Sequence, residues 1–158
     1  MAPVPRATVQ AFYQAYVTRD PAQIAPFIDD DVLWIISGPV DVLRFCGERR
    51  GKAQVMEMFD RLIPETFEVN GFNPEALLID GDRAAMLGTL FGRTGKERRK
   101  ISYRVAQFMR FRDGKIVEFR SILDSFDAAE QILGHALDVS HTSTTANDRF
   151  GIGDLVAV

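Results

Sequence analysis

The sequence has few residues of the kinds that bind metal ions or form disulfide bonds. Its 158 residues include one cysteine, Cys46, and two histidines, His135 and His141. A single cysteine cannot form a disulfide within the chain. Both histidines lie in the last part of the sequence, and with one cysteine they disfavour a buried zinc site. We therefore expect no metal and no other cofactor.

Long apolar runs, a positive net charge and an export signal are also missing. No uninterrupted apolar stretch approaches the ~20 residues that span a bilayer, and Met1–Arg6 lacks a charged region followed by an apolar run. The formal net charge of -3 disfavours a nucleic-acid-binding protein that neutralises phosphates, so the basic run Arg93–Lys100 is interpreted as a solvated turn. We expect a cytoplasmic protein without nucleic-acid or membrane partners.

The residues that are present predict helices in the first part of the chain. The expected first helix is capped by Thr8 and ends at Arg19-Asp20-Pro21, and Asp20 caps a short second helix. A further helix follows Gly51 and stops at Pro64. The apolar stripe of the first helix consists of Val9, Phe12, Tyr13, Tyr16 and Val17.

Strand patterns dominate after these helices. Residues 32–36 form a β-branched strand, residues 40–50 are irregular, and the apolar period changes to two after Pro64. The order of elements predicts an α+β domain whose helices cover one face of a curved antiparallel sheet. We expect this domain over residues 1–134, and a C-terminal extension, 135–158, that is either an extended arm or a partly disordered terminus. The later strands are predicted at 67–69, 76–79, 83–93, 101–111 and 116–123.

Several short motifs, in their order and spacing, carry a resemblance to a known superfamily. They are Phe27-Ile-Asp-Asp-Asp, Gly38-Pro39, Phe45-Cys-Gly47 and Phe111-Arg-Asp-Gly-Lys-Ile-Val-Glu-Phe. Over residues 5–134 the chain resembles the nuclear transport factor two-like superfamily, and within it the SnoaL-like and ketosteroid-isomerase-like bacterial proteins. The resemblance implies a cystatin-like α+β roll: a cone-shaped curved antiparallel sheet wrapped around a long N-terminal helix. It also implies a deep pocket for a small, mostly apolar molecule, and often a homodimer.

The catalytic positions that the resemblance implies lack the expected groups. The tyrosine and the two aspartates of ketosteroid isomerases fall on Phe12, Ile35 and Gln107, and the aspartate of epoxide-hydrolase-like and cyclase-like members falls on Ser121. Their chemistry needs a carboxylate base near hydrogen-bond donors. Steroid isomerisation by that mechanism is therefore disfavoured, and we assign no catalytic residue. An acid at Asp41 or Asp124 remains an alternative, although Asp124 is better explained as a helix cap.

Alternation along the strands and the resemblance together predict which residues line the pocket. Gln107 can donate and accept, so it either binds a carbonyl or hydroxyl of the ligand or satisfies a buried polar group. Trp34 is expected on the opposite face, unless the strand is shifted by one residue. The predicted ligand-binding residues are Phe12, Tyr16, Leu33, Ile35, Phe59, Tyr103, Gln107, Phe119 and Ser121.

Three functions stay open at this point. The first is binding of a small apolar ligand, with acid–base chemistry of the isomerase, hydratase or cyclase type. The second is a binding module without catalysis, and the third is a protein-interaction domain. On the outer sheet face Phe108 lies among Arg104, Arg110 and Arg112, a pattern that favours a homodimer contact through that face.

Overall fold

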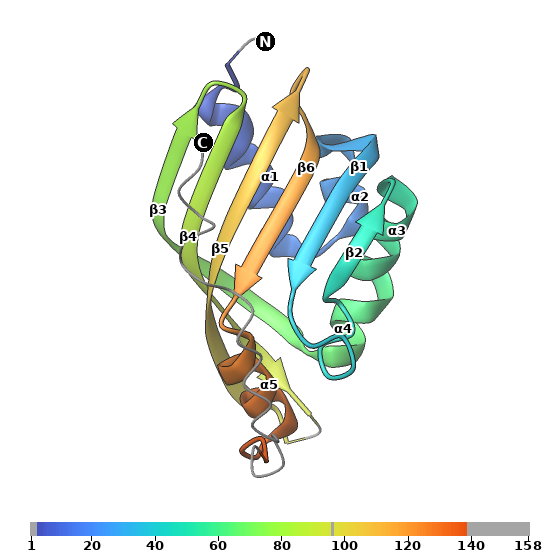
Figure 1. Ribbon diagram of the computed structural model, residues 1–158, viewed down its shortest axis with the longest axis vertical. Coiled ribbons are helices and arrows are strands. Elements are labelled where there is room, and N and C mark those ends of the chain that lie inside the picture. The colour runs from blue at the N-terminus through green and yellow to red at the C-terminus, as the bar shows by residue number, and fades with distance from the viewer. Residues whose placement is uncertain (1–2, 96, 139–158) are drawn as a thin grey trace, which may run out of the picture.

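The described part of the chain forms one curved sheet with helices on its inner side (Figure 1). The computed structural model describes residues 3–95 and 97–138. The sheet has six strands in the order β2-β1-β6-β5-β4-β3 and does not close into a barrel. The predicted α+β class and cone are confirmed. The strands are β1 (Ile28–Ser37), β2 (Gly47–Arg50), β3 (Glu68–Asp80), β4 (Arg83–Thr94), β5 (Arg99–Arg112) and β6 (Lys115–Leu123).

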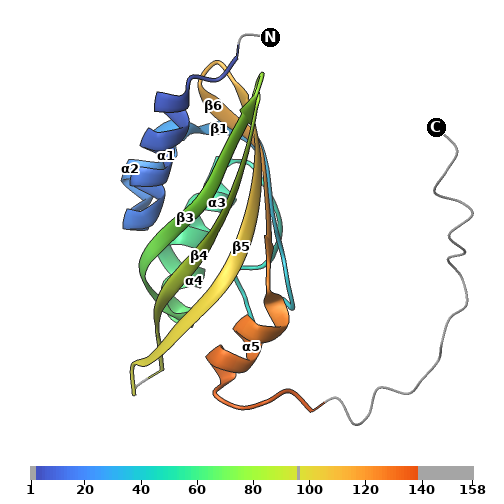
Figure 2. The same ribbon diagram turned by 90° about the vertical axis from the view of Figure 1, so that its left-hand side faces the viewer.

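Two helices at the start of the chain lie on one side of the sheet (Figure 2). Helix α1 (Arg6–Thr18) begins directly after Pro5, so the expected cap at Thr8 is wrong. Helix α2 (Pro21–Ile24) begins as predicted, since the Asp20 side chain accepts a hydrogen bond from the Ala22 amide. A single 3₁₀ turn, η1 (Ala25–Phe27), then leads into β1.

The central helical stretch contains an irregular turn. Helix α3 (Lys52–Glu57) passes into a π-helical segment, η2 (Met58–Leu62), and then into α4 (Ile63–Thr66). The predicted stop at Pro64 is wrong. This proline lies at the junction of η2 and α4, where the helical hydrogen-bond pattern changes, and the helical chain continues to Thr66.

From β3 to β6, each strand pairs antiparallel with the next strand along the chain. The two strands predicted at 67–69 and 76–79 are one strand, β3, whose pairing with β4 shifts register near Gly71 and near Pro74. A proline is tolerated there because β3 is an edge strand and its outer side needs no ladder hydrogen bonds.

The other end of the sheet differs from a purely antiparallel pattern. Strand β1 pairs in parallel with β6, with Trp34 opposite Phe119, and antiparallel with the short strand β2. Strand β2 lies within the stretch that was predicted to be irregular. Its four residues, Gly47–Arg50, carry too few apolar groups to give an alternating signal.

Helix α5 (Ser125–Leu133) completes the described fold. The Asp124 side chain accepts a hydrogen bond from the Asp127 amide, which confirms Asp124 as the cap. The Gln131 side chain donates to the Ser102 carbonyl and accepts from the Ser102 amide. These two bonds satisfy the backbone groups of Ser102, which lies in the part of β5 that extends beyond the end of β6. Residues 139–158 of the predicted C-terminal extension lie outside the described part.

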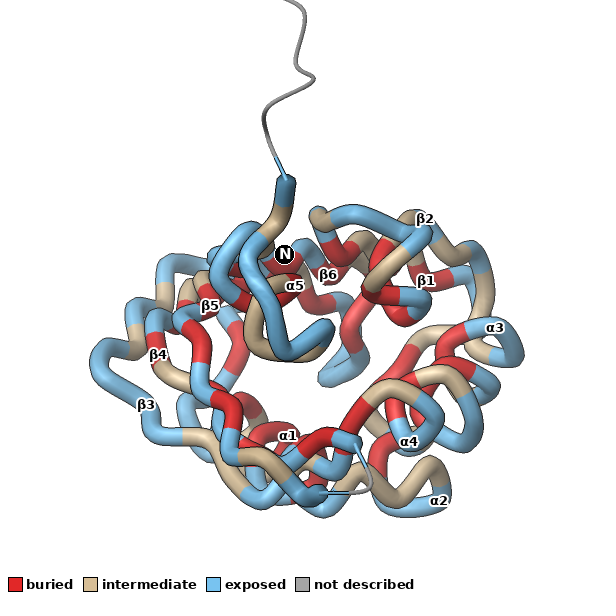
Figure 3. The backbone as a smooth tube through the Cα atoms, turned by 90° about the horizontal axis from the view of Figure 1, so that it is seen from below, coloured by how far each residue is buried: buried red, intermediate tan, exposed pale blue. Residues whose placement is uncertain are grey.

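The apolar core lies between the sheet and the helices. Figure 3 shows the buried residues along the inner side of the strands and on the helices opposite them. The largest fully buried side chains include Trp34, Phe12, Phe59 and Phe119. No helix in residues 3–95 or 97–138 is long and apolar enough to cross a membrane.

Candidate functional site

A buried amide links α1 to the middle of the sheet. Gln107 lies on the inner face of β5 and is 1% exposed. The Tyr13 hydroxyl donates to Gln107 Oε1 at 2.8 Å, and Gln107 Nε2 donates to the Tyr16 hydroxyl at 3.0 Å. Because the Tyr16 oxygen accepts this bond, its own proton is free to be donated, and it meets no acceptor within the described chain. The Tyr16 hydroxyl is therefore an available donor.

A narrow pocket opens beside this polar group. It leaves about 20 Å³ of free space, roughly the room for one water molecule. The pocket is thus much narrower than the deep pocket that the resemblance implied. Tyr16, Tyr103, Gln107 and Ser121 all line it, so these four predicted site residues are brought together. Apolar wall residues include Ile36, Phe45, Phe67, Val69 and Leu90.

Arg19 also lines this pocket, although the sequence analysis treated it only as part of a helix end. It is the residue after α1 and has a left-handed backbone, with φ of 59°. Its guanidinium carbon lies 4.0 Å from the centre of the Tyr16 ring. The position three residues after Tyr16 was the only signal in the sequence, since i and i+3 lie on one helix face.

Two predicted pocket residues of β1 are on the wrong face. Leu33 and Ile35 are only partly buried and lie opposite Glu118 and Arg120 of β6, which form an ion pair with each other. Trp34 instead is fully buried and points inward. The shift of one residue arises because residues 32–36 are all apolar, so the strand shows no alternation from which its inner face can be chosen.

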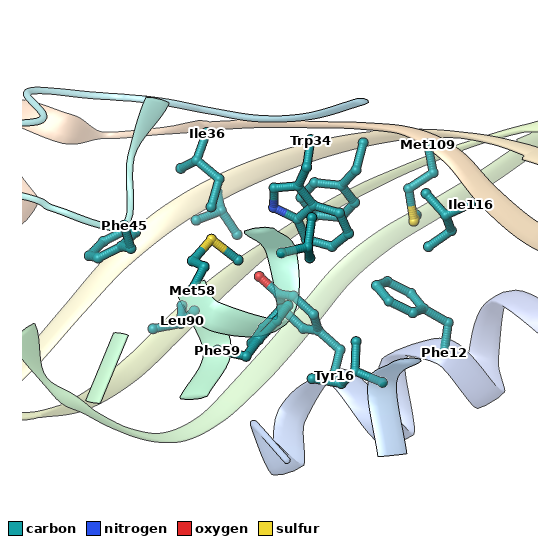
Figure 4. Close-up of a cluster of buried hydrophobic side chains, with 14 of the residues drawn as sticks. Phe12, Tyr16, Trp34, Ile36, Phe45, Met58, Phe59, Leu90, Met109 and Ile116 are labelled. Carbon is teal, nitrogen blue, oxygen red and sulfur yellow. The ribbon is translucent and has the colours of Figure 1, made fainter. Parts of the chain in front are cut away.

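The three predicted phenylalanines pack in the core rather than on the open pocket. Phe119 stacks on Trp34 with ring centres 3.7 Å apart, and Phe59 of η2 contacts both Trp34 and Tyr16 edge-on. Phe12 lies against Tyr16 and Phe119. Figure 4 shows Phe12 and Tyr16 pointing from α1 toward Trp34 and its neighbours on the sheet. Phe12 and Phe59 thus contact Tyr16, which lines the pocket, and are not themselves part of the pocket lining.

The electrostatics of the pocket are those of neutral donors and one positive charge. Burial raises the pKa of Tyr13 and of Tyr103 above the ordinary value for a phenol, so both stay protonated. At Tyr103 burial raises the pKa, and the positive charge of Arg19 offsets part of this rise because it favours the phenolate. None of the described residues that line the pocket is Asp, Glu or His. No group of acidic, His or Cys residues in the described ranges is suited to a metal.

The two alternative acids do not lie at the pocket. Asp124 caps α5, and Asp41 is exposed in the turn between β1 and β2. Neither contributes to the pocket lining. The site therefore contains donors that can polarise an oxygen atom, and it has no carboxylate that can remove a proton.

Comparison with known proteins assigns the family. The family model described as SnoaL-like domain matches residues 9–119. The chain belongs to the SnoaL-like domain family. A solved structure from Rhodopseudomonas palustris, named a "Putative Isomerase", is 34% identical to this SnoaL-like protein. The match covers 80% of this chain and 93% of that one, with a TM-score of 0.71.

Two further solved structures share the fold of this SnoaL-like protein. An NTF2-like protein from Burkholderia thailandensis is 25% identical over 84% of this chain and 98% of its own, with a TM-score of 0.69. An LEH-like epoxide hydrolase from M. tuberculosis is 19% identical over 81% of this chain and 88% of its own, with a TM-score of 0.63. A search of curated proteins gave no match.

Correcting the register of β1 brings no carboxylate to the buried inner face within residues 3–95 and 97–138 of this SnoaL-like protein. The inward positions on β1 next to the predicted Ile35 are Trp34 and Ile36. The predicted catalytic positions on β5 and β6 are Gln107 and Ser121, which do face inward. Neither the predicted catalytic positions nor the neighbouring inward positions on β1 therefore hold a carboxylate.

Proposed function

We propose that this SnoaL-like protein binds a small, mostly apolar molecule in the pocket beside Gln107. The observation that carries the proposal is the buried link from Tyr13 through Gln107 to Tyr16. Burying polar groups costs free energy unless they are hydrogen-bonded. A few convergent polar groups among apolar walls are also typical of ligand sites. In this site the Tyr16 hydroxyl is left to donate to a carbonyl or hydroxyl oxygen of the ligand.

The pocket has to widen before it admits more than a water molecule. Val69 lines it and is only partly buried, so the pocket widens by displacement of this wall while Arg19 keeps its place over the Tyr16 ring. The walls near them are the rings of Phe45 and Phe67. A molecule with one aromatic ring fits these contacts best, because ring edges and faces pack favourably at such distances.

The chain offers a built-in reporter for the test. Trp34 is the only tryptophan, so its indole N–H gives one NMR signal. Its ring lies 5.9 Å from Phe59, which in turn contacts Tyr16. Titration with benzamide, a neutral one-ring probe, is expected to shift this signal and to saturate. Native mass spectrometry of the purified protein then shows whether it carries a molecule of its own.

A matched pair of variants locates the binding. Val69→Phe narrows the pocket and should weaken benzamide binding by about tenfold, whereas Val40→Phe, in an exposed turn, should leave it unchanged. Equal affinity of the two variants, or the lack of any saturable shift in the wild type, would contradict the proposal.

Turnover of isomerase type is a second candidate, favoured by the R. palustris relative. Such a reaction moves a proton and requires a base as well as the donor at Tyr16. The probe is 3-cyclohexenone, whose double bond shifts into conjugation with the carbonyl when a proton is moved. Binding without conversion supports a binding module. Conversion by the wild type that is lost in Tyr16→Phe supports an isomerase.

We also propose that two copies pair through the outer face of the sheet. Leu87, Ala106 and Ile122 lie side by side on β4, β5 and β6, and Phe108 follows two residues along β5. Phe108 and Ile122 are about half exposed. An apolar row across several strands is typical of an interface, and pairs of identical chains are the commonest oligomers.

A further inference from the structure

We infer that the molecule bound in the pocket carries an anionic oxygen group, a carboxylate, and that Arg19 binds it. This inference rests on the proposed function and specifies the class of ligand, an apolar acid.

The chain directs Arg19 inward at some cost. A non-glycine residue in the left-handed region is uncommon and strained by ~1 kcal/mol or more, yet Arg19 has φ of 59° as it ends α1. This turn places the guanidinium over the ring of Tyr16, 4.0 Å from its centre, and 5.8 Å from that of Phe59. The nearer contact, with the Tyr16 ring, is a cation–π interaction that holds the guanidinium in place.

The edge of the guanidinium remains unpaired. Nε and Nη2 of Arg19 are buried and have no hydrogen-bond partner in the described residues. These two nitrogens form one side of the guanidinium, so their N–H bonds point in the same direction. That edge matches the two oxygens of a carboxylate, with which arginine forms two parallel hydrogen bonds. Other arginines of the chain do find carboxylates, as Arg61 does with Glu57 and Arg98 does with Glu68.

The described residues around Arg19 in the pocket include hydrogen-bond donors but no negatively charged group. The Tyr16 hydroxyl is free to donate, and the pocket residues with described side chains include no carboxylate. Although Arg19 is only partly buried as a whole, two buried guanidinium nitrogens without a hydrogen-bond partner are unfavourable. A carboxylate bound at the pocket would neutralise Arg19, accept from both unpaired nitrogens and leave the apolar part of the ligand against the phenylalanine walls.

The test compares two probes of nearly the same shape. Benzoate is an anion and benzamide is its neutral counterpart, and both are titrated while the Trp34 indole signal is followed. The wild type should bind benzoate more tightly than benzamide. Arg19→Met should weaken benzoate binding by about tenfold to a hundredfold while benzamide binding changes little, since an ionic hydrogen bond is worth more than a neutral one. Arg19→Lys should retain part of the preference.

The control is Arg93→Met, which removes the same charge from an exposed position on β4. It should bind benzoate like the wild type, and thermal unfolding checks that every variant is folded. A benzoate preference that persists in Arg19→Met, or that is absent from a wild type that binds benzamide, overturns the inference and leaves the pocket proposal intact. If neither probe binds the wild type, the pocket proposal itself fails.

Discussion

Single residues decide how polar this interior is, and Gln107 is the most consequential of them. Its side-chain amide accepts a hydrogen bond from the Tyr13 hydroxyl and donates one to the Tyr16 hydroxyl. A substitution that removes the amide therefore leaves both hydroxyls without this buried partner. The alternation of β5 predicts that Gln107 faces inward, because every second residue on either side of it is apolar. These residues are Ile101, Tyr103, Val105, Met109 and Phe111. The partners on α1 are not predictable in this way, since their distance depends on how the helix lies across the sheet.

Replacement of the amide tests this link at the level of stability. Gln107→Leu is expected to lower the free energy of unfolding by about 1–3 kcal/mol, because buried hydroxyls lose their hydrogen bonds. Denaturant unfolding measures the change. Combined with Tyr13→Phe, the loss should be smaller than the sum of the single changes, since the two residues share one bond. Strictly additive losses would argue against the link.

Cys46 provides a second prediction for a single side chain. Burial raises the pKa of its thiol to about 12, only partly offset by the charge of Arg49. The reactive thiolate is therefore scarce at pH 8. In the folded protein a disulfide reagent such as Ellman's should react slowly with Cys46, and in denaturant one thiol per chain should react at once. Rapid reaction of the folded protein would show that the thiol is accessible.

Among the elements, the pairing of β3 with β4 relies on close backbone approach at two glycines. A Cβ atom on Gly92 would clash with the Glu68 carbonyl oxygen, which belongs to the backbone. A Cβ atom on Gly71 would meet only the ring of Phe91, whose side chain is partly exposed and can rotate. The two positions therefore differ in what has to move.

This difference gives a matched pair of variants. Gly92→Ala should lower the free energy of unfolding by about 1–3 kcal/mol, as expected where extra atoms are forced into a packed site. Gly71→Ala should cost clearly less, because its neighbour is a movable side chain. Thermal or denaturant unfolding of both variants measures the contrast. If both variants lose the same free energy of unfolding, moving the backbone near Glu68 costs no more than rotating the Phe91 ring, and this prediction is wrong.

Elements were predictable from the sequence where a periodic pattern was long. The strands β4, β5 and β6 and the first helix follow such patterns. Strand β2 has only four residues, and Pro74 interrupts the signal of β3, which is nevertheless continuous because an edge strand tolerates proline. In β1 the uniform run from Val32 to Ile36 hid which side faces inward. Arg19 was missed because a charged residue before Asp20-Pro21 carries the ordinary signature of a helix end.

For the whole molecule, the proposed pairing through the outer sheet face predicts a change in oligomeric state. Phe108→Glu introduces a charge beside the apolar row and should shift the protein from dimer to monomer, as seen by light scattering after size-exclusion chromatography. Phe126→Glu is the matched control: Phe126 is similarly exposed, but on α5. It should leave the mass unchanged. A wild type that is monomeric at all concentrations would contradict the pairing.

The parallel pairing of β1 with β6 has a consequence for how the chain reaches its final form. Trp34 acquires its stacking partner, Phe119, only when a strand from the far end of the domain has been made. Contacts between residues so distant in sequence slow folding, because a long loop must be closed first. During synthesis the early helices and β1 thus remain without their main support, and the indole of Trp34 becomes enclosed at a late step.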